Sequence, residues 1–124
     1  MGVDIFKQII TGAFYNAEDF EKGFVENYFE KGETFGEGIS NDIVLIQLNP
    51  YCDENSILQD YAIGIIEESL PGDSERAAQN APEVLSVLPD RLESIAKVKD
   101  ALITLKLYDE VKHPIKTYRI EYFG

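Results

Sequence analysis

The chain has 124 residues, 44% of them hydrophobic, and its 23 acidic and 11 basic residues give a formal net charge of −12. This length favours one compact domain over residues 1–124, and the hydrophobic fraction is too high for a disordered chain. The negative charge would repel nucleic-acid phosphates and anionic lipids, so we expect neither direct nucleic-acid binding nor membrane association.

Residues 4–32 are predicted to form a helical hairpin. The apolar residues of a first helix, over residues 4–15, recur at helical spacing: Ile5, Phe6, Ile9, Ile10, Ala13 and Phe14. Asn16 is a suitable N-cap for a second helix, with Asp19 completing a capping box, and Gly32 would end that helix in a left-handed conformation. Aromatic residues at this spacing are expected in the core: Phe14, Phe20, Phe24, Tyr28 and Phe29.

A glycine-rich segment, KGETFGEGIS, occupies residues 31–40. It lacks the spacing of a phosphate-binding loop, and Glu33 and Glu37 would repel an anion, so we expect a surface loop or one that orders against a partner. The following residues, 42–48, are predicted to be a strand. Five of the six residues from Ile43 to Leu48 are apolar without alternation, which indicates burial on both faces.

Residues 57–70 allow two interpretations. A helix over residues 57–66 is preferred because it has the longer match, with apolar residues at Ile57, Leu58, Tyr61, Ala62, Ile65 and Ile66. The stretch YAIGII, residues 61–66, fits a strand that pairs with residues 43–48, and Gly64 weighs against the helix. Ser74 is then expected to cap a short helix that extends to Ala81.

The last part of the chain predicts one helix and one strand. The helix runs from Asp90 to about Leu105, although ITLKLY at residues 103–108 also alternates as a strand would. In the stretch IKTYRIEYF, residues 115–123, large apolar residues alternate with more polar ones, which predicts a half-buried strand with one solvated face.

These elements together predict an α+β fold. We expect a helical hairpin at the N-terminus and a small, mostly antiparallel sheet covered by helices. The sheet would have two to four strands, including residues 42–48 and 115–123, depending on how the two ambiguous segments fold.

The sequence contains one cysteine and one histidine. Cys52 as a nucleophile with His113 as its base would need hydrogen-bond contact and a third, orienting group. We favour the simpler interpretation, a thiol at a turn and an exposed histidine before a proline. A lone cysteine forms no internal disulfide, which fits a reducing compartment such as the cytoplasm. The first residues, MGVDIFKQ, lack the basic region of a secretory signal.

Two groups of acidic residues are candidate cation sites. Asp53 and Glu54 lack the pattern of a calcium loop and are better explained as the start of a helix, where they would complement its dipole. The second group flanks a Pro-Gly turn and is expected to be a solvated surface: Glu67, Glu68, Asp73 and Glu75. We therefore predict no catalytic residue, no metal site and no cofactor.

The charge is divided along the chain. Residues 16–75 hold 15 acidic residues and two lysines, whereas residues 76–124 hold seven acidic and eight basic residues. Two unlike surfaces suit head-to-tail contacts between copies, which close into rings or extend into filaments. We therefore expect a non-enzymatic protein–protein interaction or assembly subunit that contacts copies of itself as a structural component. Virion or phage head–tail connectors are comparable in size and in lacking an active site, an analogy of build that no motif supports.

The candidate interface residues are of two kinds. Basic and aromatic candidates lie near the C-terminus, where the tyrosines would belong to an edge strand open to strand addition: Lys106, Lys112, Lys116, Tyr118, Arg119 and Tyr122. Their acidic counterparts are Glu33, Glu37, Glu67 and Glu68. Two other functions are considered. One is an acidic nucleic-acid mimic that inhibits a basic DNA- or RNA-binding protein, and the other is a small hydrolase-type enzyme.

Overall fold

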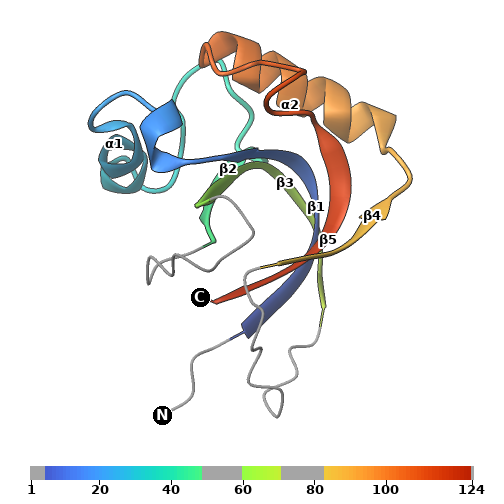
Figure 1. The fold of residues 1–124 in the computed structure, drawn as a ribbon. Helices are drawn as coiled ribbons and strands as arrows, with labels where there is room; N and C mark the ends of the chain where they lie inside the picture. Colours follow the sequence, from blue (N-terminus) through green and yellow to red (C-terminus); the bar gives the residue numbers. More distant parts are fainter. Residues whose placement is uncertain (1–4, 49–59, 71–82, 124) are drawn as a thin grey trace, which may run out of the picture.

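The computed structural model describes residues 5–48, 60–70 and 83–123, which are built around a five-stranded antiparallel sheet (Figure 1). The strands are β1 (Ile5–Tyr15), β2 (Val44–Gln47), β3 (Tyr61–Leu70), β4 (Glu83–Leu88) and β5 (Lys116–Phe123). The helical elements are a 3-10 turn (Ala17–Asp19), α1 (Phe24–Glu30) and α2 (Leu92–Thr104). The strand order is β2-β3-β1-β5-β4, so β1 lies at the centre and β2 and β4 lie at the two edges.

The predicted N-terminal helical hairpin is wrong, because residues 5–15 form β1. The apolar pairs that suggested a helix also fit a strand buried on both faces, because Ile10 and Ala13 pack in different core clusters. β-Branched residues and Gly12 favour the strand over the helix. The segment predicted as the second helix forms the 3-10 turn and the seven-residue α1 instead of one continuous helix. Gly32, with a φ of 76°, follows α1 in the left-handed conformation that we predicted.

The preferred helix over residues 57–66 is wrong where the structure describes it, because β3 begins at Tyr61 and pairs antiparallel with β2. Gly64 of β3 lies opposite Gly12 of β1. A Cβ atom on Gly64 would collide with the backbone of Thr11, and one on Gly12 would collide with the backbone of Ile63. The two glycines therefore let β1 and β3 approach more closely than any side chain would allow.

Of the remaining predictions, some are confirmed and one strand was missed. α2 confirms the helix over residues 90–105 and excludes a strand over 103–108. β2 and β5 confirm the two strands that were predicted with least ambiguity. β4 was not predicted, and with it the sheet has five strands rather than two to four. The short helix expected from Ser74 to Ala81 lies outside the described residues.

Side chains are buried on both faces of the sheet. The sheet is curled, and α2 lies across its convex side (Figure 1). One core cluster includes residues of α1 and α2: Ala13, Tyr15, Tyr28, Ile43, Leu45, Ile63, Val98, Ala101 and Leu102. The other cluster is made by strand residues and Leu48: Ile10, Ile46, Leu48, Ala62, Tyr118, Ile120 and Tyr122. Leu45 belongs to the first cluster and Ile46 to the second, so β2 is buried on both faces as predicted.

Candidate functional sites

The four basic candidate residues are all exposed, but they lie in two places. Lys106 and Lys112 line the same pocket. Lys116 and Arg119 lie three residues apart on β5, whose pairing with β1 has an unbroken register. Because successive side chains of a strand alternate, Lys116 and Arg119 point to opposite faces of the sheet. β5 therefore presents no single basic patch.

The tyrosine candidates are part of the core rather than of a free edge. β5 lies between β1 and β4, so the edge strand that we expected at residues 115–123 is inside the sheet. Tyr118 packs on Phe14 with ring centroids 4.8 Å apart. The Tyr122 hydroxyl donates a hydrogen bond to Gln8 Oε1 at 2.8 Å, and burial raises the pKa of Tyr122 to about 12. Both tyrosine side chains are buried and do not form a contact surface.

The acidic candidates also separate. Glu33, Glu37 and Glu68 are exposed. The Glu67 side chain is 9% exposed and accepts hydrogen bonds from Arg91 Nη1 at 2.7 Å and from Ser94 Oγ at 2.6 Å. These two contacts hold the start of α2 against β3. Glu67 therefore has a structural role, whereas the other three are free to face solvent or a partner.

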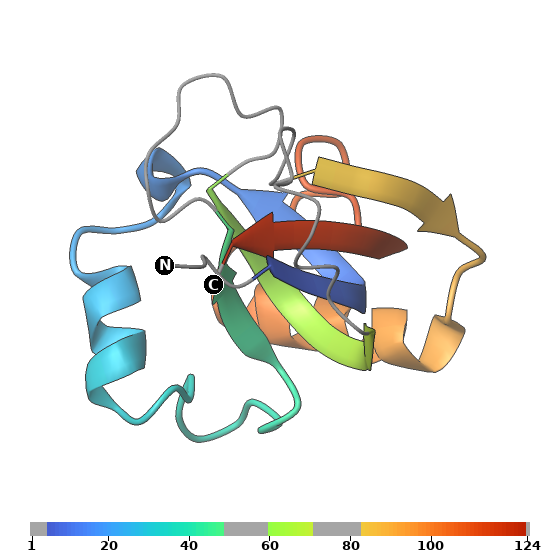
Figure 2. The same ribbon diagram turned by 90° about the horizontal axis from the view of Figure 1, so that it is seen from below.

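β4 forms an open edge of the sheet. β5 pairs with one side of β4, and no described element pairs with its other side (Figure 2). The five residues from Val84 to Leu88 carry no charge, and Leu85 and Val87 are 40% and 59% exposed. An uncharged edge strand with exposed aliphatic side chains is open to pairing with another chain. The apolar run between Pro82 and Pro89 is the sequence signal for β4.

β2 forms the opposite edge. The N–H of Leu48 donates to the carbonyl of Asp60 at 2.8 Å, toward β3. Peptide groups alternate in direction along an antiparallel strand, so the N–H of Gln47 points away from β3. Gln47 is exposed. No described strand pairs with that side of β2, which therefore offers backbone hydrogen-bond groups to another strand.

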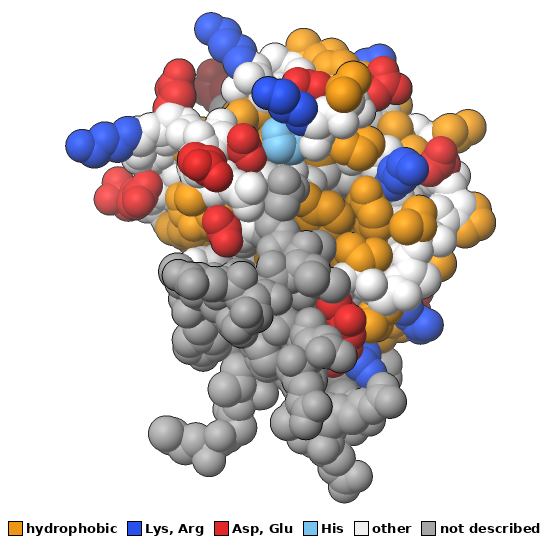
Figure 3. All heavy atoms as spheres, in the orientation of Figure 1, with side chains coloured by type: hydrophobic (Ala, Val, Ile, Leu, Met, Phe, Trp, Pro, Cys, Tyr) orange, Lys and Arg blue, Asp and Glu red, His pale blue; other side chains and the backbone are white. Residues whose placement is uncertain are grey.

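The charge division of the sequence is carried into the sheet. The described residues from 16 to 70, which form α1, β2 and β3, include eleven acidic and two basic residues. Residues 83–123, which form β4, α2 and β5, include seven of each. Figure 3 shows acidic side chains around α1 and hydrophobic side chains gathered over the region of β5 and β4. The part of the molecule that contains the β2 edge is thus acidic, and the part that contains the β4 edge is near neutral.

His113 lies at a pocket of about 230 Å³ between the end of β1 and the segment that follows α2. It is buried, which corrects the expectation of an exposed histidine. Its ring stacks on Tyr15 at a centroid distance of 4.1 Å, and its Nδ1 lies 2.6 Å from the carbonyl oxygen of Phe14. Its Nε2 lies 3.8 Å from Oδ2 of Asp19. Burial, with the charge of Asp19 second, raises the pKa of Tyr15, whose hydroxyl donates to the carbonyl of Leu107 at 2.9 Å.

The other wall of this pocket comes from residues 106–112. Oδ1 of Asp109 accepts hydrogen bonds from the N–H groups of Val111 and Lys112, each at 3.0 Å. The bond from Lys112 is the main reason why the pKa of Asp109 is lowered. Lys106 stands at a left-handed φ of 61° directly after the end of α2. Lysine, histidine and carboxylate side chains therefore meet around one small space.

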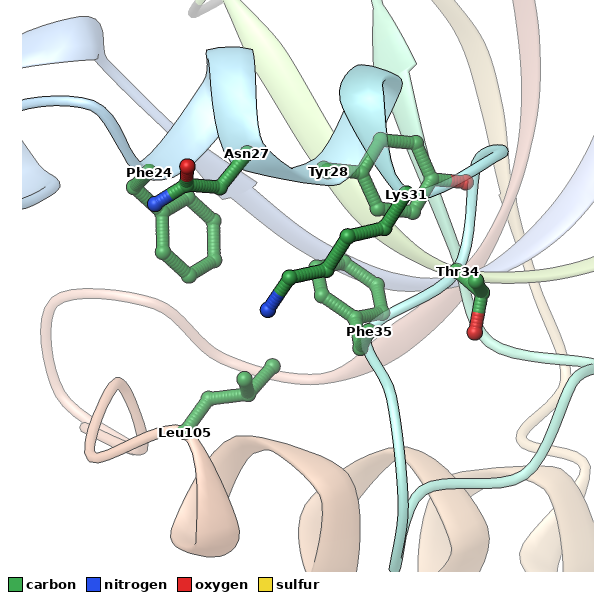
Figure 4. A pocket seen from close by; sticks show the side chains of 7 residues that line it. All are labelled: Phe24, Asn27, Tyr28, Lys31, Thr34, Phe35 and Leu105. Carbon is green, nitrogen blue, oxygen red and sulfur yellow. The ribbon is translucent and has the colours of Figure 1, made fainter.

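A second pocket of about 150 Å³ lies between α1 and the end of α2 (Figure 4). Phe24, Phe35 and Leu105 face this space, and the Lys31 side chain extends across it (Figure 4). Phe24 and Phe35 are partly buried against the core, with ring centroids 6.0 Å apart. The pocket is thus a gap in the packing of aromatic side chains, with one cation at its rim.

Several predicted sites cannot be placed. Cys52, Asp53 and Glu54 lie outside the described residues, as do Asp73 and Glu75. Among the residues that are described, no three histidine, cysteine or acidic side chains lie close enough to hold a metal ion. In the same ranges, neither helix is long and apolar enough to cross a membrane.

Comparison with known proteins assigns no family to this chain. No protein-family model, no curated protein and no solved structure matches this chain.

Proposed function

We propose that this chain is a non-enzymatic assembly subunit that contacts copies of itself head to tail in the cytoplasm. The contact adds β4 of one copy to the open edge of β2 in the next. The observation that carries the proposal is the open, uncharged edge of β4, on which Val87 is 59% exposed. Joining two different edges of one sheet gives a ring if the rotation between copies closes and a filament if it does not.

Charge favours this pairing over a symmetric contact between two β2 edges. The β2 edge belongs to the part of the molecule that holds eleven acidic and two basic residues. Two copies of that part repel each other, whereas the β4 edge lies beside the exposed Lys116 and Arg119 of β5. Such charges steer the encounter and its orientation, but each exposed ion pair contributes only ~0–1 kcal/mol. Backbone hydrogen bonds and burial of aliphatic side chains would supply most of the affinity.

The first test compares two identical substitutions. Val87→Lys places a charge on the β4 edge, and Val111→Lys places the same charge on a loop where the side chain is already 91% exposed. Light scattering at up to about 100 µM would populate an interface of micromolar affinity. We expect the wild type and Val111→Lys to assemble and Val87→Lys to be monomeric, with unchanged circular dichroism in all three. Equal assembly of the two variants would remove β4 from the contact.

The second test distinguishes head-to-tail pairing from a symmetric dimer. Gln47→Pro deletes an N–H that points away from β3, so it blocks the β2 edge without breaking the pairing of β2 with β3. Val87→Lys keeps its β2 edge, and Gln47→Pro keeps its β4 edge. We therefore expect each variant to be monomeric alone and the mixture to form a dimer with one copy of each.

Other outcomes identify the rival functions. If Gln47→Pro assembles like the wild type while Val87→Lys does not, β4 pairs with β4 in a symmetric dimer. If the wild type stays monomeric throughout the concentration range, the assembly proposal fails. The acidic surface would then be better explained by a basic protein partner, as in the nucleic-acid mimic.

A further inference from the structure

The contacts of His113 leave two hydrogen-bond acceptors facing each other. The carbonyl oxygen of Phe14, 2.6 Å from Nδ1, can only accept, so Nδ1 carries the hydrogen. In the neutral ring, Nε2 then presents a lone pair toward Oδ2 of Asp19, 3.8 Å away. The side chains of His113 and Asp19 are 9% and 31% exposed, and Oδ2 of Asp19 also accepts the N–H of Asn16 at 2.8 Å, so a group bound in the pocket can reach both atoms. A donor with at least two hydrogens, placed beside both atoms, would satisfy both acceptors.

The same pocket also offers donors that need an acceptor. Lys106 and Lys112 line it, and both side chains are exposed enough to turn toward a bound group. Neither lysine forms a salt bridge among the described residues, where the salt bridges involve Arg91, Lys97 and His113. Besides the hydrogen bond from the N–H of Lys112, the charge of Lys112 helps to lower the pKa of Asp109, which also lines the pocket. A carboxylate accepts charge-assisted hydrogen bonds from ammonium groups, so the two lysines suit a bound carboxylate.

Lys106 occupies a position where lysine is unfavourable. The N–H of Leu107 donates to the carbonyl of Leu102 at 2.8 Å, and the N–H of Lys106 donates to that of Ile103 at 3.1 Å. This pattern ends α2 with Lys106 in the left-handed conformation, a position at which glycine is the usual residue. At the corresponding end of α1, the residue is Gly32. The chain therefore keeps a strained backbone at the residue whose side chain lines the pocket.

We propose that the pocket between Asp19, His113, Lys106 and Lys112 binds a small amino-carboxylate, such as a free amino acid. The ammonium group of the ligand donates to His113 Nε2 and Asp19 Oδ2, and its carboxylate accepts from Lys106 and Lys112. The cavity of about 230 Å³ has room for a small molecule of this kind. This site is separate from the β4 edge, so it does not depend on assembly.

The experiment uses the single histidine of the chain as a reporter. Its imidazole signals in an NMR titration are unambiguous, and we would follow them during addition of glycine, acetate or methylammonium. Glycine carries both charged groups, and each of the other two carries one. We expect a saturable shift with glycine and a dissociation constant on the order of 1 mM, which is reasonable for a ligand of so few atoms. Acetate and methylammonium should bind at least about tenfold more weakly, because each leaves one half of the site unsatisfied.

Three variants complete the test. Lys106→Gly removes one proposed contact with the ligand carboxylate, and glycine fits the left-handed backbone at this position. Asp19→Asn removes a negative charge but keeps a side-chain oxygen that can accept the hydrogen bond from the N–H of Asn16, as Asp19 does. Each should weaken glycine binding at least about tenfold. Lys97→Ala is the control, because Lys97 contacts Asp42 and does not line this pocket.

Three results would overturn the proposal. They are the absence of a saturable His113 shift with glycine, equal affinity for acetate and glycine, and undiminished binding by Lys106→Gly. Circular dichroism and thermal unfolding would verify that each variant remains folded, so that lost binding is not mistaken for lost structure.

Discussion

β3 and β4 differ in how completely the rest of the described structure surrounds them. β3 has a described neighbour on each side, and its residues Ala62 and Ile63 are fully buried. β4 pairs only with β5 among the described strands, and the side chain of Val87 is more than half exposed. The side chains of β3 are accounted for by packing and by the close approach of β1. Packing within the described residues does not account for Leu85 and Val87, which are apolar yet reach solvent. Residues that folding leaves unexplained are therefore the ones that we assign to contact with another molecule.

The largest expected effect comes from Gly64 in β3. Gly64→Ala should destabilise the fold by about 4 kcal/mol or more, because the new Cβ collides with backbone rather than with a side chain that can move. Gly38→Ala is the control: Gly38 has a φ of 85° but open space around it, so only the left-handed strain of about 1–2 kcal/mol remains. Urea unfolding of both variants measures the difference. Equal losses would mean that β1 and β3 do not approach closely at the glycine pair.

Truncating one aliphatic residue in each strand tests the comparison directly. Ile63→Ala should cost about 2–5 kcal/mol of unfolding free energy, because it opens a cavity in the core. Val87→Ala should change this free energy by less than about 1 kcal/mol, because its side chain is already largely exposed. The same urea titrations give both values. A large loss for Val87→Ala would show that β4 is needed for folding, and the functional argument for its surface would weaken.

Alkaline pH should lower the free energy of unfolding through the buried hydroxyl group of Tyr122. Burial raises the pKa of Tyr122 from 10.0 to about 12, so the unfolded chain loses this proton first as the pH rises. The contribution is fully present below pH ~10 and disappears between pH ~10 and ~12, a loss of about 3 kcal/mol. Tyr122→Phe cannot ionise, so its stability should fall less steeply over this interval, although it also loses the bond to Gln8. Matching slopes for the two proteins would contradict the assigned pKa.

The smallest effect has the opposite sign. Lys106→Gly should stabilise the protein by about 1 kcal/mol, because glycine adopts the left-handed conformation after α2 without strain. Gly32→Lys after α1 should destabilise it by a similar amount. Thermal unfolding of both variants gives the signs. A destabilised Lys106→Gly protein would show that the lysine side chain contributes to folding rather than to binding.

Sequence patterns predicted some elements well, and the reason is physical. β2 and α2 were predicted because each satisfies one pattern: a short apolar run without alternation for β2, and a long helical period for α2. Gly32 was identified because a glycine after a helical period has a specific conformational use. These signals are local, and the rest of the fold does not overrule them.

β1 and β3 were predicted as helices because a strand buried on both faces loses the alternation that marks strands. The resulting pairs of adjacent apolar residues, Ile5 with Phe6 and Ile9 with Ile10, resemble a helical period. The facing glycines, Gly12 and Gly64, were the available signal, but each is only a weak mark against a helix by itself. The pocket of His113 was not foreseen at all, because its walls come from segments about ninety residues apart in sequence that only the fold brings together.

The central place of β1 has a consequence for how fast the molecule can fold. Thr11 of β1 bonds Thr117 of β5 through their hydroxyl groups at 2.8 Å, across 106 positions of the sequence. Contacts of such separation require a large loop to close before they contribute, so folding should be slow for a chain of this size. During synthesis, β1 is made before β5, so the backbone groups of β1 that pair with β5 stay unpaired until β5 has been made. Over this interval the newly made chain is exposed to the wrong pairings that an open strand invites, and it would benefit from a chaperone.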